Sequence, residues 1–207
     1  MVKVLKRPAI NTFNLHKFNL INRSLKTLLK TYKSVIKFIL TFLLAYLLLS
    51  IGYKFYLDLS QGSKYYPDYL TQLVAKQSKQ LINVIGYSAD IQNHPNEASI
   101  KLIIHGKYVA RVVEGCNSIS VIILFVSFML AFAGRAKPTA LFIFAGSVLI
   151  YAVNLIRIVI LSVGLYHYPW RREILHTVIF PLIIYGLVFM LWMIWVNRFS
   201  KLKKQHG

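Results

Sequence analysis

The chain has 207 residues, of which 57% are apolar and only 15% are charged, and 25 Lys and Arg stand against 6 Asp and Glu. Soluble domains carry about 25% charged residues, so this composition argues against soluble acid chemistry and against a disordered chain. A formal net charge of +19 is compatible with nucleic-acid binding, but nucleic-acid binders are not usually this apolar. We therefore expect a membrane protein without a nucleic-acid partner, whose basic residues face anionic lipids and report its topology.

The first apolar run follows a strongly basic leader. Residues 1–37 contain nine Lys and Arg and no acid, and residues 38–57 are apolar over a length that can cross a bilayer. A secretory signal has a shorter basic region and a shorter apolar core than this. The pattern predicts an uncleaved first membrane span with the basic leader in the cytoplasm.

Three further apolar runs predict spans at residues 116–134, 139–166 and 174–197. Basic clusters precede the first span, separate the second from the third, and form the tail at residues 198–207. An even number of spans places all three clusters on one side of the membrane, as the positive-inside rule requires. The predicted fold class is an all-α polytopic membrane protein, a four-helix transmembrane bundle with both termini cytoplasmic.

Residues 58–115 form the segment between the first two spans and contain five of the six acids, which favours the outer face. Residues 69–85 have apolar side chains at helical spacing, which predicts an amphipathic helix lying on the membrane. Residues 98–113 are rich in β-branched side chains around His105-Gly106 and predict two short strands. The bundle should therefore carry a small extracytoplasmic α+β insert.

Cys116 is the only cysteine, so an intramolecular disulfide and paired-cysteine metal sites are excluded. Zinc-protease and phosphate-loop motifs are also absent, and we expect neither a metal nor a cofactor. A lone cysteine is usually a small buried apolar residue. Cys116, however, is predicted at the outer mouth of the second span, where the helix dipole favours a thiolate.

Arg157 is the clearest ionisable residue inside an apolar run, and such residues are costly in a membrane. It follows Thr139 by 18 residues, about 27 Å of helix, which places it near the outer boundary of a core about 30 Å thick. It ends a polar stripe at steps of three and four, formed by Ser147, Tyr151, Asn154 and Arg157. The alternative is an arginine that extends to the outer headgroups.

His176 lies at the start of the fourth predicted span, again toward the outer face. Alone it could be an ordinary interfacial histidine. A topology assigned from Lys and Arg nevertheless places Cys116, Arg157 and His176 in the same outer layer. Because these residue types supply a nucleophile, a fixed positive charge and a general acid and base, the three together predict a membrane thiol enzyme.

Two motifs resemble those of the exosortase family. Residues 114–118, Glu-Gly-Cys-Asn-Ser, resemble the exosortase signature Glu-Ala-Cys-Ser-Gly, and residues 154–158 match its Asn-x-x-Arg-Ile. His176 stands where the family's third invariant residue is expected. The resemblance covers roughly residues 108–196 and is closest to the short exosortase F type.

The resemblance implies a cysteine transpeptidase of the bacterial inner membrane with its active site toward the periplasm. Its substrates would be exported proteins that end in a short motif, a transmembrane helix and a basic tail, cleaved through a thioester. The resemblance assigns Cys116 as nucleophile, Arg157 as oxyanion or thiolate stabiliser and His176 as general acid and base. Supporting roles fall to Glu114, Asn117 and Asn154.

Other functions stay open at this point. A non-catalytic assembly or scaffold protein of a surface-export system would also carry basic cytoplasmic segments, and a small transporter could use Arg157 to bind an anion. The transporter is disfavoured because the chain has neither an inverted repeat nor pairs of broken helices. A scaffold or carrier should tolerate serine at Cys116, whereas a thiol enzyme should not. The acyl acceptor, whether water, an amine or a lipid, is undetermined.

Overall fold

The computed structural model describes residues 31–60, 67–132 and 134–198, except for the side chain of His176. The chain divides into two compact units, residues 1–41 and 42–207, and helix α2 (Lys33–Ser60) crosses the boundary between them. Most of the predicted basic tail at 198–207 and most of the predicted leader at 1–37 lie outside the described residues.

The described chain is mostly helical. Three helical segments are long and apolar enough to cross a membrane: Lys33–Ser60, Ala136–His167 (α5) and Pro169–Arg198, the last of which includes α7 (Phe180–Arg198). A fourth apolar helix, α4 (Ile119–Ala131), has 13 residues, about 20 Å at 1.5 Å per residue. Because α4 by itself is shorter than a bilayer core, the four-span bundle stays a prediction.

Local sequence explains where α5 begins and ends. Pro138 lies in its first turn, where a missing N–H costs no helical hydrogen bond. The helix stops at His167 because Tyr168 precedes Pro169, and a residue before proline is driven out of the helical region; Tyr168 has φ −132° and ψ 67°. The 32 residues of α5 extend about 48 Å, well beyond a bilayer core.

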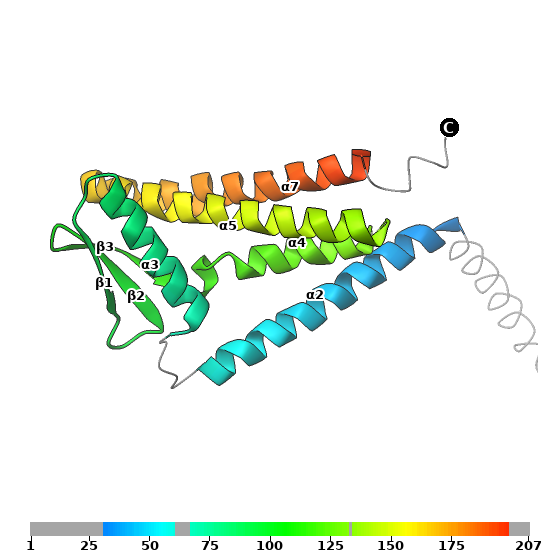
Figure 1. Cartoon of the computed structure of the whole chain (residues 1–207), viewed down its shortest axis with the longest axis horizontal. Coiled ribbons are helices and arrows are strands. Elements are labelled where there is room, and N and C mark those ends of the chain that lie inside the picture. Colours follow the sequence, from blue (N-terminus) through cyan, green and yellow to red (C-terminus); the bar gives the residue numbers. More distant parts are fainter. Residues whose placement is uncertain (1–30, 61–66, 133, 199–207) are drawn as a thin grey trace, which may run out of the picture. The chain divides into compact units, whose positions relative to one another are not determined.

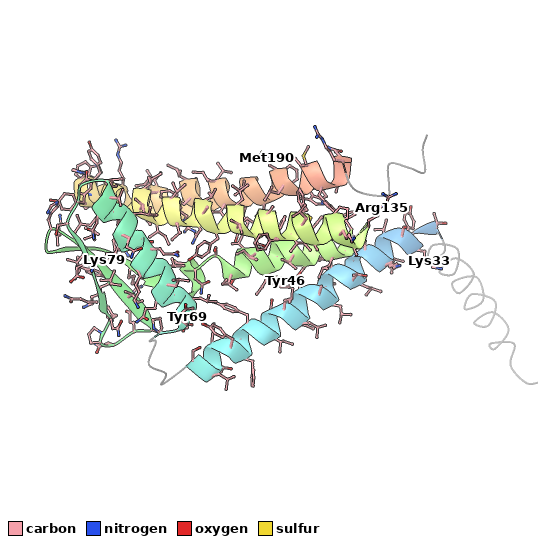
Figure 2. The ribbon with its side chains drawn as sticks, in the orientation of Figure 1. Lys33, Tyr46, Tyr69, Lys79, Arg135 and Met190 are labelled. Atoms are coloured by element: carbon pink, nitrogen blue, oxygen red, sulfur yellow. The ribbon has the colours of Figure 1, made fainter. Side chains whose placement is uncertain are left out.

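Helices α4, α5 and α7 lie side by side (Figure 1). At one end, the indole nitrogen of Trp195 donates to the carbonyl oxygen of Phe132 at 3.4 Å. Arg135, which precedes α5, lies at this end, whereas Lys79 lies near the sheet at the other end (Figure 2). The apolar core of the three helices contains Phe125, Met129, Ile150, Leu191 and Trp195.

The insert is a three-stranded antiparallel sheet covered by one helix. Its strands, β1 (Ala89–Asn93), β2 (Ser99–Ile104) and β3 (Lys107–Val113), lie in that order in the sheet. The β2–β3 hairpin confirms the strands predicted around His105-Gly106. Both turn residues have positive φ, 48° and 75°, the backbone that a tight two-residue hairpin requires.

Helix α3 (Tyr69–Val84) forms where an amphipathic helix was predicted. Its buried residues are Thr71, Val74, Ala75, Ser78 and Ile82, and they contact the sheet and α5. Leu81 and Val84, two apolar residues of the predicted amphipathic stretch, are exposed, Val84 by 82%. One side of the helix therefore covers the sheet, and contact of its exposed apolar side chains with lipid stays a prediction.

Candidate active site

A cleft of about 760 Å³ contains two of the three predicted catalytic residues, Cys116 and Arg157. One wall is strand β3 and the opposite wall is the C-terminal half of α5, from Arg157 to Leu165. The segment after α5 completes it with Trp170, Arg172, Glu173 and Thr177. The cleft therefore lies at the sheet end of the helices.

Cys116 does not lie in the first turn of a helix, contrary to the expectation from sequence. It ends a 3₁₀ turn, η1 (Glu114–Cys116), and α4 begins three residues later at Ile119. Between them Ser118 has a left-handed backbone, with φ 66°, and Asn117 accepts a hydrogen bond from the backbone N–H of Ile119 through Oδ1 at 3.1 Å. Cys116 therefore lies outside α4, before its first turn.

Buried side chains on both sides hold the loop that carries Cys116. Asn117 is 1% exposed and donates through Nδ2 to the hydroxyl of Tyr53 at 2.7 Å and to Oγ1 of Thr71 at 3.3 Å. The Tyr53 hydroxyl in turn donates to the backbone oxygen of Glu114 at 3.4 Å. Helix α2 and helix α3 of the insert therefore meet at the residues that flank Cys116.

Asn154 links Cys116 to Arg157. It is 2% exposed and donates through Nδ2 to the backbone oxygen of Cys116 at 2.8 Å. Its Oδ1 accepts a hydrogen bond from Nη1 of Arg157 at 3.4 Å. One buried amide on α5 thus orients both the loop that carries the thiol and the guanidinium beside it.

The guanidinium of Arg157 is held on one side and open on the other. Its Cζ lies 5.8 Å from the centre of the Phe180 ring, a favourable cation–aromatic contact. Its Nε is buried without a hydrogen-bond partner in the described part of the chain. Because Arg157 also lines the cleft, its guanidinium is positioned to donate to an anionic oxygen there.

The charges around the cleft are mostly positive. Three arginines line it, Arg111, Arg157 and Arg172, together with one acid, Glu173. Arg111 pairs with Glu97 outside the lining. Burial raises the pKa of the Glu114 carboxyl, and the negative charges of Asp68 and then Asp58 raise it further.

The segment that carries His176 departs from regular helix. Residues Leu175–Ile179 form a π-helical turn, η3, between α6 (Arg172–Ile174) and α7. Such turns insert an extra residue, rotate the side chains that follow, and recur at functional sites. The backbone of His176 lies in this turn, next to the cleft-lining residue Thr177; its side chain is outside the described structure.

The other candidate histidine, His167, hydrogen-bonds the Tyr87 hydroxyl through Nε2 at 2.8 Å and is not among the lining residues.

Sequence reasoning missed Tyr53, Thr71 and Trp170. Tyr53 lies within an apolar helix and Thr71 lies 45 residues before Cys116, so no local spacing relates either residue to the thiol. The aromatic and basic segment around Trp170 was a visible signal for a role at the site. No group of three or more His, Cys, Asp or Glu side chains within the described ranges could hold a metal ion.

The arrangement defines a multi-pass helical membrane protein with a thiol and an arginine in one cleft. The family model of the transmembrane exosortases matches residues 24–197. The chain belongs to that family. No curated protein and no solved structure matches it.

Proposed function

We propose that the protein is a membrane-embedded cysteine transpeptidase that cleaves C-terminal sorting signals of exported proteins. The observation that carries the proposal is the cleft that Cys116 and Arg157 share, where Asn154 hydrogen-bonds the residues of both. We also propose that the protein lies in the bacterial inner membrane with both termini in the cytoplasm and the cleft toward the periplasm. The exosortase F type is the subgroup whose motifs it resembles most.

In the proposed reaction the thiolate of Cys116 attacks the scissile peptide carbonyl. The carbonyl oxygen becomes an oxyanion, which the guanidinium of Arg157 stabilises as a hydrogen-bond donor that needs no reorganisation. The carbon–nitrogen bond then breaks, His176 protonates the leaving amine, and a thioester remains. A second nucleophile releases the acyl group and restores the thiol.

The test is processing of an exported reporter that ends in a sorting signal from the same genome, with an apolar helix and a basic tail. An immunoblot at matched membrane levels compares wild type with Cys116→Ser, Arg157→Lys and His176→Ala. We expect Cys116→Ser and His176→Ala to abolish processing. Arg157→Lys keeps the charge but loses the planar guanidinium, and losing such a donor costs about 3–4 kcal/mol of transition-state stabilisation.

His167→Ala is the matched control, because His167 bonds to Tyr87 rather than lining the cleft. It should process the reporter at close to the wild-type rate. Processing by Cys116→Ser would point to a scaffold role instead. An inactive His167→Ala beside an active His176→Ala would show that the general acid and base was assigned to the wrong histidine.

A further inference from the structure

Strand β3 is one of the two edge strands of the sheet, and its unpaired edge borders the cleft. It pairs with β2 alone, through residues 107–113. Residues 108–113 all line the cleft, although successive side chains of a strand point to opposite faces. Because six consecutive residues line the cleft, side chains of one face alone cannot account for the lining, and the backbone edge of the strand faces the cleft. Apart from the ladder with β2, the backbone of β3 makes no hydrogen bond within the described residues.

The opposite wall is an apolar helix face. Ile158, Leu161 and Leu165 line the cleft at steps of three and four along α5, so they share one face. The exposed ring of Trp170 closes one side of this wall. The cleft is thus a groove with unpaired backbone groups along one side and apolar side chains along the other, the two features that an extended peptide needs.

We propose that the substrate binds as an extended peptide that adds a fourth strand to the free edge of β3. The proposal rests on the proposed function and supplies its mode of substrate recognition. Backbone hydrogen bonds to β3 would align the residues just before the scissile bond, and alternate side chains would contact the α5 wall. The scissile carbonyl would then reach Cys116, three residues after Val113.

The direction of the added strand follows from the chain itself. β3 leads through η1 directly into the apolar helix α4. A sorting signal has the same order, an extended motif followed by an apolar helix. Both segments therefore approach the membrane in the same direction, and the added strand runs parallel to β3. Parallel pairing uses evenly spaced hydrogen bonds from alternate residues, so the peptide should depend on every second N–H group.

A basic side chain of β3 favours a peptide over a second copy of this chain. Lys107 belongs to the strand and is exposed. An exposed lysine on an edge strand disfavours edge-to-edge pairing with a second copy. A neutral or acidic peptide meets no repulsion from this charge.

The experiment measures alkylation of Cys116 by acetyl-tetra-alanyl chloromethyl ketone in the full chain reconstituted in nanodiscs. The thiolate displaces chloride, so a carbon–sulfur bond forms and a carbon–chlorine bond breaks without turnover of a natural substrate. Because Cys116 is the only cysteine, mass spectrometry identifies its adduct, and Cys116→Ser is the blank. Four further probes each carry one N-methyl group, which removes a single N–H donor.

We expect the parent probe to alkylate Cys116 at least about ten-fold faster than chloroacetone, which carries the same reactive group without the peptide. N-methylation at alternate positions should slow the reaction about five-fold, the effect of one lost hydrogen bond, and the intervening positions should have no effect. Equal rates for all four methylated probes would overturn the proposal. A dimer joined through Lys107 of β3 by a lysine-reactive cross-linker, applied without the probes, would overturn it as well. If N-methylation slows alkylation at alternate positions but the reporter is not processed, strand addition is supported and the proposed enzyme function is wrong. If the reporter is processed but the N-methylated probes show no alternation, the enzyme function is supported and strand addition is wrong.

Discussion

The insert and the helices beside it both have an apolar core, but they differ in how many directional hydrogen bonds add to it. In the insert, directional hydrogen bonds position the chain: the sheet ladder, the Asp68 side chain that caps α3 at Leu70 and Thr71, and Oδ1 of Asn83, which accepts from the backbone of Ala89 at 2.7 Å. In α4, α5 and α7, side-chain packing dominates, with the Phe128 and Trp192 rings 4.8 Å apart, edge to face.

Cys116 lies where these two regions meet. Thr71, in the insert, holds the neighbouring Asn117, and Asn154, on α5, holds the carbonyl oxygen of Cys116. Weakening hydrogen bonds in the insert and weakening packing in the helices should therefore have separable effects on stability. Only the contacts that join the two regions should also change the chemistry at Cys116.

The largest effect is expected from Asn154→Ala, which removes such a joining contact. It removes the hydrogen bond to the partly buried carbonyl of Cys116, at a cost of about 1 kcal/mol, and frees Arg157 from its acceptor. Misplacing catalytic groups by about 1 Å can cost about 100-fold in rate, so reporter processing should fall by about that factor. Asn83→Ala is the control, because it breaks a hydrogen bond inside the insert and should lower stability with little loss of processing. Equal losses of processing in Asn154→Ala and Asn83→Ala would show that contacts joining the two regions are no more important for the chemistry than contacts within the insert.

Gly146→Ala tests packing in the helices. A Cβ at Gly146 would lie 2.4 Å from Cζ of Phe125, a fully buried ring, so the ring must move at a cost of about 1–3 kcal/mol. Gly186→Ala is matched in chemistry and meets nothing within 4 Å; its better helix propensity should leave the protein as stable as wild type or slightly more so. Thermal unfolding in detergent compares the two, and similar melting temperatures would contradict the packing argument.

Asp68→Ala tests the capping hydrogen bonds of the insert. The carboxylate accepts from the backbone N–H groups of Leu70 and Thr71 at 2.9 and 3.0 Å, and losing such a cap costs about 0.5–2 kcal/mol. Hydrogen exchange of the α3 amides should accelerate, while amides in α5 change little. Asp68→Asn keeps an oxygen acceptor and should lose less. An unchanged α3 in Asp68→Ala would mean that packing, not the cap, holds this helix.

The smallest effect is expected from Glu114→Gln, and it depends on pH. The pKa of Glu114 is raised in the folded protein, by burial first and then by Asp68 and Asp58. The folded state thus binds the proton more tightly than the unfolded state, so ionisation lowers stability as pH rises through the unfolded and then the folded pKa. Glu114→Gln should raise the melting temperature slightly at pH 8 and not at pH 3. A larger rise in melting temperature at pH 3 than at pH 8 would contradict a raised pKa of Glu114 in the folded protein.

The sequence by itself determined the helical membrane class, the β2–β3 hairpin and the residues worth suspecting. Apolar runs and their basic flanks are local in the chain, and so is a turn such as His105-Gly106. The polar positions along residues 147–157 could likewise be placed on one face from helical periodicity alone. These features need no knowledge of what packs against them.

Only the tertiary structure decided which surfaces meet. Strand β1 pairs with β2 although it is short and contains Asp90 and Asn93, residue types that are depleted in strands, since a strand gains most of its stability from its partner. α3 buries the face that the sheet offers, not the face with the largest apolar side chains. Tyr53 contacts Asn117 and Asn154 contacts Cys116, which joins residues 64 and 38 positions apart on either side of the 3₁₀ turn. No local pattern encodes such contacts, because their free energy exists only once the surfaces are in place.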